Sequence, residues 1–290
     1  GNKENIKMKK IIVLLLILLL ILLLVFRLNS IGLKVTKVKI NSDVNNTIRI
    51  VQLSDLHNSK FGSNNMKLVD IVKYQNPDLI VMTGDMLNRE EERTDIVTKL
   101  INSLTEIAPV YYGYGNHEDS WMKKYNKDLK KILTDAGAIV VDNNYVDVDI
   151  NGNQLRIGGY MGYYRIPGML QLSEEELKGQ NEFFERFEDT ERYKILLNHI
   201  PTTWVDWGYN NYPVDLVFSG HYHGGQCVLP FIGPLYAPYI GFNPPFVKGI
   251  YTGEYATCIL SSGLGNEHIY LPRINNPPEI VVVDLKPTTE

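Results

Sequence analysis

Residues 47–57, with the sequence TIRIVQLSDLH, alternate apolar and polar side chains and then end in a carboxylate and an imidazole. A period of two is typical of a strand, so we expect Thr47 to Leu53 to form one. Ser54, Asp55 and His57 then lie at the carboxyl end of that strand. In open α/β sheets this is the end at which ligands bind.

Two more apolar segments end in polar groups. Leu79 to Met82 precedes Thr83-Gly84-Asp85, and Val110 to Tyr112 precedes the sequence GYGNHE of residues 113–118. The intervening sequences have helical spacing, which predicts helices at Met66 to Tyr74, Arg89 to Ile107 and Lys123 to Ala136. Strands that alternate with helices predict an α/β fold with its polar clusters at one edge of a sheet.

Shorter elements are expected in the second half of the chain. The predicted helix is Ser173 to Glu188, and the predicted strands are Val146 to Ile150, Gln154 to Gly158, Ile195 to Leu197, Leu216 to Phe218 and Glu279 to Leu285. With 290 residues and 44% hydrophobic content, the chain can bury one large core. One domain behind a short leader is therefore the simplest division.

Five of the six histidines lie near predicted strand ends: His57, His117, His199, His221 and His223. Neutral imidazole together with carboxylate or amide oxygen suits zinc, iron or manganese rather than calcium. In an extended backbone, residues two apart share one face, so each of the pairs Asp55-x-His57 and His221-x-His223 can reach a common site. Taken singly such pairs are weak signals, because short patterns recur by chance. The structural alternatives are a capping role for Asp55, a turn role for Gly84-Asp85 and core hydrogen bonding by His199.

The five clusters DxH, GD, GNHE, NHIP and GHYHGGQ together resemble the calcineurin-like metallophosphoesterases over about residues 47–285. The GHxHGGQ form, Ser262-Gly263-Leu264-Gly265 and Pro278-Glu279-Ile280 are similar to the membrane-associated bacterial branch of that family. The resemblance implies a four-layer αββα sandwich, in which two mixed sheets pack face to face with helices outside.

The resemblance also implies two divalent metal ions and assigns their ligands. Asp55, His57 and His223 would bind one ion, Asn116, His199 and His221 would bind the other, and Asp85 would bridge them. His117 would face the scissile phosphate without binding metal. Arg89 either contacts substrate phosphate or is solvated. Where relatives carry GDxxDR, this chain has Asn88, which leaves open what orients His117.

Such a site would carry excess positive charge, because two divalent ions outweigh the carboxylates of Asp55 and Asp85. The excess attracts phosphate, and a metal-bridging hydroxide would attack phosphorus. The resemblance therefore implies a metal-dependent phosphoesterase that uses Mn, Zn or Fe. A pyrophosphatase acting on a sugar nucleotide or lipid diphosphate, and an inactive phosphate-binding protein, are the alternatives.

The leader has a basic start and an apolar run. Lys9 and Lys10 precede an uncharged stretch from Ile11 to Phe26, which Arg27 closes. Sixteen residues of helix span about 24 Å, slightly less than the roughly 30 Å hydrocarbon core, and flanking cations can snorkel. A retained anchor, a cleaved signal peptide and a buried helix compete, and the absence of an A-x-A-like cleavage pattern and of a polar face favours the anchor.

We therefore expect a basic N-terminus over residues 1–10, a signal anchor over 11–28, a tether over 29–46 and a catalytic domain over 47–290. Met8 resembles a natural start, which would make residues 1–7 an added segment. A basic segment before an apolar run directs export, so we expect a single-pass membrane protein with an extracytoplasmic catalytic domain. Its substrate would be a phosphate ester, for example a lipid-linked one.

Composition limits the other partners. The net charge of -4 and the lack of a basic patch in the sequence disfavour nucleic acid as a partner. Cys227 and Cys258 stand in no zinc-ligand spacing, so we expect two ordinary buried thiols. The oligomeric state is left open.

Overall fold

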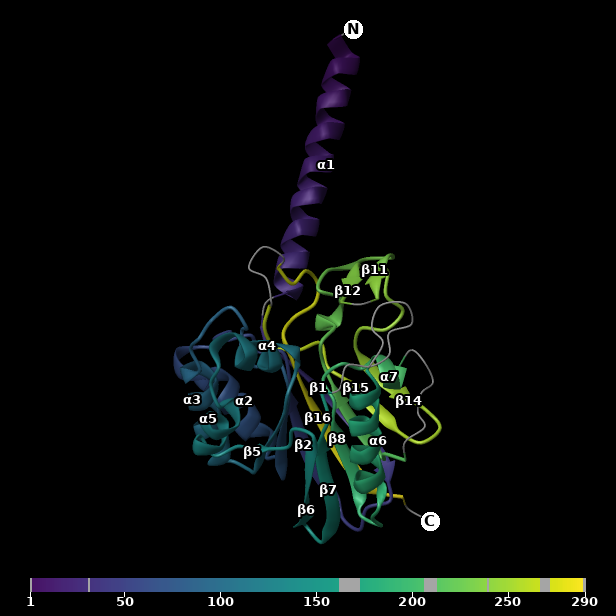
Figure 1. Cartoon of the computed structure of the whole chain (residues 1–290). Coiled ribbons are helices and arrows are strands. Elements are labelled where there is room, and N and C mark those ends of the chain that lie inside the picture. Colours follow the sequence, from purple (N-terminus) through teal and green to yellow (C-terminus); the bar gives the residue numbers. More distant parts are fainter. Residues whose placement is uncertain are drawn as a thin grey trace.

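The computed structural model describes residues 2–30, 32–161, 173–205, 213–238, 240–266 and 272–288. A long helix, α1 (Asn2–Asn29), projects from a domain of two six-stranded sheets (Figure 1). Both sheets contain parallel and antiparallel pairs. The predicted α/β architecture with two mixed sheets and an N-terminal apolar helix is therefore confirmed.

The first sheet has the order β1-β16-β2-β3-β4-β5. Its strands are β1 (Lys34–Ser42), β16 (Glu279–Pro287), β2 (Ile48–Leu53), β3 (Leu79–Thr83), β4 (Val110–Gly113) and β5 (Ile139–Val140). Strand β16 pairs parallel with β1 and antiparallel with β2, and the remaining pairs are parallel. The carboxyl ends of β2, β3 and β4 therefore meet at one edge.

The second sheet has the order β14-β15-β9-β8-β7-β6. Its strands are β14 (Gly249–Thr252), β15 (Thr257–Leu260), β9 (Leu216–Ser219), β8 (Tyr193–Leu197), β7 (Asn153–Gly159) and β6 (Asn144–Ile150). The central pairs are parallel and the two outer pairs are antiparallel. The carboxyl ends of β8 and β9 therefore lie at the same edge of this sheet.

The helices cover the outer faces of the sheets. They are α2 (Met66–Gln75), α3 (Asp95–Thr105), α4 (Asn116–Tyr125), α5 (Leu129–Asp135), α6 (Glu174–Glu188) and α7 (Thr202–Val205), with short 3₁₀ turns η1 (Ser63–Asn65) and η2 (His223–Gly225). Helices α2 to α5 lie on the side of the first sheet, and α6 lies on the side of the second (Figure 1). The order of the layers is thus helix, sheet, sheet, helix.

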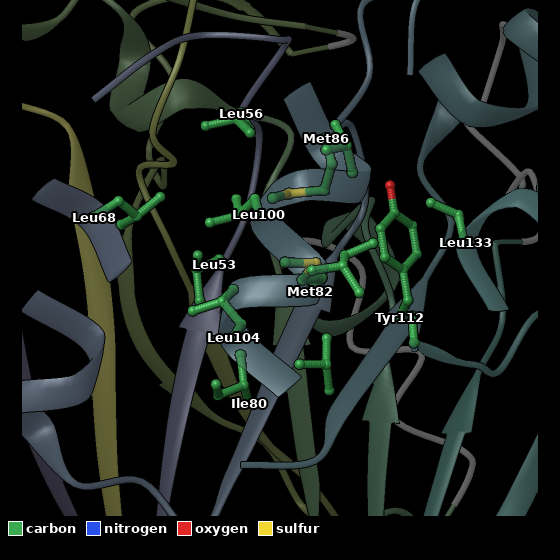
Figure 2. Packing of buried hydrophobic residues seen from close by; sticks show 14 of the residues in the cluster. Leu53, Leu56, Leu68, Ile80, Met82, Met86, Leu100, Leu104, Tyr112 and Leu133 are labelled. Carbon is green, nitrogen blue, oxygen red and sulfur yellow. The ribbon is translucent and has the colours of Figure 1, made fainter. Parts of the chain in front are cut away.

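Three buried clusters hold these layers together. Between the sheets, Ile50 and Val81 of the first sheet pack with Ile157 and Ile195 of the second. Figure 2 shows the layer beneath the helices of the first sheet, where Leu53, Ile80 and Met82 lie beside Leu100 and Leu104 of α3. On the other side, Phe183, Phe184 and Phe187 of α6 pack on the second sheet. Each such side chain contributes about 1.5–3 kcal/mol when fully buried.

Two predicted helices differ from the structure. The helix expected from Arg89 begins only at Asp95, because the preceding backbone is held elsewhere: the N–H of Glu91 bonds to the C=O of Asn88, and Trp121 Nε1 donates to the C=O of Glu91. The helix expected over Lys123 to Ala136 is two helices, α4 and α5, since Asn126 has the left-handed φ of 49°. Helix α4 begins at Asn116, inside the predicted site and seven residues before the predicted start.

Part of the expected tether, residues 29–46, belongs to a sheet. Within it Lys34–Ser42 forms β1, whose register pairs Val38 with Val283 of β16. Lys34, Lys37 and Lys39 face outward on this edge strand, which discourages pairing with another chain. Strands β14 and β15 and two short hairpins after residue 227 were also not predicted.

Candidate metal centre and active site

The predicted site residues meet where the carboxyl ends of both sheets converge. Asp55 and His57 follow β2, Asp85 follows β3, Asn116 and His117 begin α4 after β4, His199 follows β8, and His221 and His223 follow β9. The carboxylates and imidazoles of this set are at most 6% exposed. Charged or polar groups buried to this degree need compensation from one another or from a bound ion.

One group of donors consists of Asp55, His57 and His223, whose ligand atoms lie within 4.8 Å of one another. His57 Nε2 is 3.2 Å from His223 Nε2, and His223 Nε2 is 3.5 Å from Asp55 Oδ1. The Oγ of Ser54 and the backbone N–H of His221 donate to the Asp55 carboxylate. These bonds fix the carboxylate between the two sheets.

A second group consists of Asp85, His199 and His221. His199 Nε2 is 3.0 Å from Asp85 Oδ2, and the rings of His199 and His221 have centroids 5.1 Å apart. His199 Nδ1 lies 2.7 Å from the carbonyl oxygen of Thr83, to which it donates. A histidine that gives one N–H to a backbone carbonyl has its other nitrogen fixed for metal binding, a common arrangement around bound metals.

The donor spacing fits transition-metal ions. Ligand atoms at about 2.0–2.2 Å from one ion are about 3–4 Å apart, which is the range found between these nitrogens and oxygens. Asp85 links the groups, because its Oδ2 is also 4.0 Å from His57 Nε2. Asn116 Oδ1 is buried and has no hydrogen-bond partner among the described residues, as expected of an oxygen reserved for an ion.

The backbone of the site is not extended as expected. Left-handed φ angles occur at five of the predicted ligands: Asp55 (53°), His57 (46°), Asp85 (52°), His221 (74°) and His223 (48°). The side chains of each i, i+2 pair therefore converge through tight turns rather than through strand alternation. Residues other than glycine are uncommon in this conformation, and such strain clusters at functional sites.

Two glycines leave room for the carboxylates. A Cβ on Gly115 would lie 2.3 Å from Asp85 Oδ1, and a Cβ on Gly220 would lie 2.2 Å from Asp55 Oδ2. Any larger residue would displace the carboxylates. The glycines of the GNHE and GHYHGGQ sequences are thus explained by close approach.

His117 is held by backbone groups. Its own N–H donates to Asp85 Oδ1 at 2.7 Å, and its Nδ1 accepts a hydrogen bond from the N–H of Arg89 at 3.2 Å. An accepting Nδ1 places the proton of neutral imidazole on Nε2. The side chain of Asn88 accepts from the N–H of Glu90, so the N–H of Arg89 orients the ring.

The site also shifts the ionisation of its members. Burial, and then His223, hold the pKa of His57 well below its usual value. Burial opposes ionisation of Asp85, but His199 and His117 outweigh it and hold the pKa of that carboxyl well below its usual range. Burial lowers the pKa of His199, yet Asp85 and Asp55 raise it to about 10. The centre therefore combines an anionic Asp85 with a neutral His57, which suits cation binding, and an ion bound at His199 would displace the proton from its Nε2.

A family model described as calcineurin-like phosphoesterase matches residues 48–225, which include every predicted site residue. This chain belongs to the calcineurin-like phosphoesterase family. It is accordingly a metal-dependent phosphoesterase.

Three relatives illustrate the relationship. The metallophosphoesterase YkuE of Bacillus subtilis is 31% identical over 83% of this chain and 79% of its own length. The phosphodiesterase YaeI of Escherichia coli is 26% identical over 82% of each chain. A transmembrane protein with a metallophosphoesterase domain from Danio rerio is 26% identical over 83% of this chain and 54% of its own length.

Glu118 of this calcineurin-like phosphoesterase was not predicted as a site residue. Its carboxylate is fully buried and accepts hydrogen bonds from the N–H groups of Asp85, Met86 and Gly115 at 2.7–2.9 Å. The carboxylate also accepts hydrogen bonds from the N–H of Leu87 at 3.3 Å and from Tyr112 Oη at 2.8 Å. The signal was present, because Glu three residues after Gly115 stands at the capping-box position of α4.

Arg273 of the calcineurin-like phosphoesterase was also missed. Its guanidinium is buried and donates to the C=O groups of Ser262 and Gly265 at 2.7–3.1 Å and to the C=O of His223 at 3.5 Å. Burial lowers its pKa to about 10. Arg273 thus ties the loop of His223 to the loop of Gly265, and a single charge in an apolar segment was its sequence signal.

Proposed function

We propose that this phosphoesterase hydrolyses phosphate esters at a binuclear metal centre. Asp55, His57 and His223 hold one ion, Asn116, His199 and His221 hold the other, and Asp85 bridges them. The observation that carries the proposal is the position of Asp85, whose Oδ2 is 3.0 Å from His199 Nε2 and 4.0 Å from His57 Nε2. A carboxylate between two imidazole groups is suited to share two cations.

When bound, two divalent ions supply positive charge to the phosphoryl oxygens and lower the pKa of a water that attacks phosphorus. The chain contributes a buried cluster of ligand groups in which the carboxylates of Asp55 and Asp85 would return only two negative charges. An imidazole that binds an ion is neutral and adds no negative charge, so the positive excess would remain and attract a phosphate anion. Because the cluster is buried, the effective dielectric constant around it is low, and each of these electrostatic interactions is stronger than in water.

His117 assists the leaving group in this proposal. Because its Nδ1 accepts from the N–H of Arg89, its Nε2 carries a proton that can be donated in a hydrogen bond to a phosphate or leaving oxygen. Its ring lies 4.4 Å from the ring of His57, centroid to centroid, so it borders the first group of donors. Arg89, whose side chain is 36% exposed and whose Nε lies 3.9 Å from Glu90 Oε1, would contact the substrate phosphate.

We further propose that α1 is a single-pass anchor and that the substrate is a membrane or cell-envelope phosphate ester. Residues 5–25 form a helix long and apolar enough to cross a membrane, with its side chains uncovered by the domain. The Danio rerio relative, named as a transmembrane protein, supports this assignment. The basic residues before the apolar run favour an extracytoplasmic domain, and residues 47–290 are its catalytic part.

The full-length protein tests the proposal with an aryl phosphodiester and added Mn²⁺ or Zn²⁺. We expect metal-dependent turnover that falls about 10²- to 10⁴-fold in His117→Ala and is lost in Asp85→Asn. Asp135→Asn is the matched control, because that exposed carboxylate pairs with Lys131 on α5. Its turnover should equal that of the wild type.

A substrate panel and a metal count complete the test. Phosphomonoesters, phosphodiesters and pyrophosphates compared under one condition separate an esterase from a pyrophosphatase. Elemental analysis should find two metal ions per chain. Tight phosphate binding without turnover of any substrate would contradict the proposal and favour a binding protein.

A further inference from the structure

The segment from Cys227 to Val247, here called the rim segment, contains no Asp, Glu, Lys or Arg. It forms two small hairpins, β10–β11 (Val228–Leu229 with Gly233–Pro234) and β12–β13 (Tyr236–Ala237 with Gly241–Phe242). A surface loop of this length normally carries charges. Their absence indicates that the rim segment does not face bulk water alone.

The rim segment exposes large apolar side chains. Phe231 at the tip of the first hairpin is fully exposed, Phe242 is 84% exposed and Ile232 is 63% exposed. Phe231 also has a left-handed φ of 66°, which a bulky residue adopts rarely. A strained turn that presents a phenyl ring outward is expected to have a partner for that ring.

The rim segment lies beside the foot of α1. The N–H of Asn275 donates to Ser30 Oγ, just after α1, and Asn275 Nδ2 donates to the C=O of Val228 in β10. One residue thus connects the end of the apolar helix to the first hairpin. Figure 1 shows β11 and β12 at the end of the domain from which α1 projects.

The rim segment is also packed on the metal-binding loop. It begins two residues after the end of η2, which contains His223. Gly225 of η2 lies so close to Pro234 of β11 that a Cβ there would be 2.3 Å from the proline Cβ. A cavity of about 530 Å³ has Leu23 of α1 on one wall. Its other walls include Ser59, two residues after His57, and Arg273, which donates to the C=O of His223. The metal centre therefore lies at the same end of the domain as α1.

We infer that the rim segment lies in the lipid–water interface of the bilayer that α1 spans, with Phe231, Ile232 and Phe242 inserted. The inference rests on the anchor in the proposed function and extends it, because it turns the metal centre toward the membrane surface. Uncharged aromatic and aliphatic side chains are the chemistry that this interface favours. The substrate class that reaches such a site directly is a phosphate ester held in the membrane by its own hydrocarbon.

The test uses the full chain in phosphatidylcholine nanodiscs, with one environment-sensitive fluorophore on an introduced cysteine. Phe231→Cys and Phe242→Cys probe the rim segment, and Leu16→Cys probes α1. The matched control is Tyr74→Cys, an 86% exposed aromatic near the opposite end of β2, where Arg49 donates to the C=O of Gln75. The native thiols should label slowly, because burial raises the pKa of Cys227 and raises that of Cys258 to about 12.

Nitroxide lipids should quench labels 231, 242 and 16, whereas label 74 should be quenched only by aqueous iodide. If label 16 is quenched and labels 231 and 242 behave like label 74, the rim inference is overturned while the anchor stands. Protection of labels 231 and 242 from both quenchers would show that protein rather than lipid covers the rim segment and would also overturn the inference. If label 16 is not quenched, the anchor itself fails.

Discussion

The carboxylate of Glu118 accepts a hydrogen bond of 2.7 Å from the backbone N–H of Asp85. Glu118 has no group in the donor clusters, yet it determines where the Asp85 backbone lies. It joins the loop after β3 to Gly115 at the start of α4. The Asp85 carboxylate accepts a hydrogen bond from the N–H of His117, so the position of Asp85 is fixed at both its backbone and its side chain.

Glu118→Gln should loosen this loop. The side-chain amide places an NH₂ group against backbone N–H donors that now bond to carboxylate oxygens, and unsatisfied buried groups cost about 1–3 kcal/mol each. We expect a loss of unfolding free energy in that range, measured by urea denaturation, together with weaker metal binding. Tyr112→Phe, which removes one donor to Glu118, is the control and should lose only about 0.5–1.5 kcal/mol. Equal losses would contradict this account.

Gly115→Ala should displace the Asp85 carboxylate, since the added Cβ would lie 2.3 Å from Oδ1. We expect reduced metal content by elemental analysis and reduced turnover. Gly179→Ala is the matched control, because nothing lies within 4 Å of a Cβ at that position of α6. It should retain metal and gain about 0.5–1 kcal/mol of stability from the better helix former. Full metal content in Gly115→Ala would contradict this prediction, because it would mean that the loop moves enough to accommodate the added Cβ.

Metal removal should destabilise the domain. Ions that bind only the folded state stabilise it by about 2.7 kcal/mol at a concentration of 100 Kd. Calorimetry should therefore find a higher Tm with Mn²⁺ or Zn²⁺ than with a chelator. The rise should shrink in Asp85→Asn and persist in Asp135→Asn. A rise of equal size in both variants would mean that the ions bind elsewhere.

Acid should remove the stabilisation supplied by Asp147. The hydrogen bond from Arg156 holds the pKa of Asp147 below its ordinary value of 3.8. A carboxyl with a depressed folded pKa stabilises fully above its unfolded pKa and loses that contribution as pH falls through the folded value. The Tm of Asp147→Asn should thus lie below that of the wild type at pH 7, and the gap should close below about pH 3.8. A gap independent of pH would contradict this sign.

The strands and their polar ends were predictable because the signal is local. Alternation along Ile48–Leu53 identifies a strand, and the residues after it must lie at its carboxyl edge. The start of α3 was not predictable, because residues 89 and 91 bond to His117 and Trp121, about 30 positions along the chain. Likewise the roles of Glu118 and of the Arg89 N–H depend on turns that bring three loops together.

Strand β16 lies between β1 and β2, although it is translated after every other strand. On the ribosome β1 has no neighbour to pair with, and the first sheet cannot close until residues 279–287 have emerged. Such long-range pairing is slow and leaves an open edge during synthesis. The first sheet is therefore complete only after residues 279–287 have left the ribosome, and until then the unpaired β1 edge is a target for chaperones.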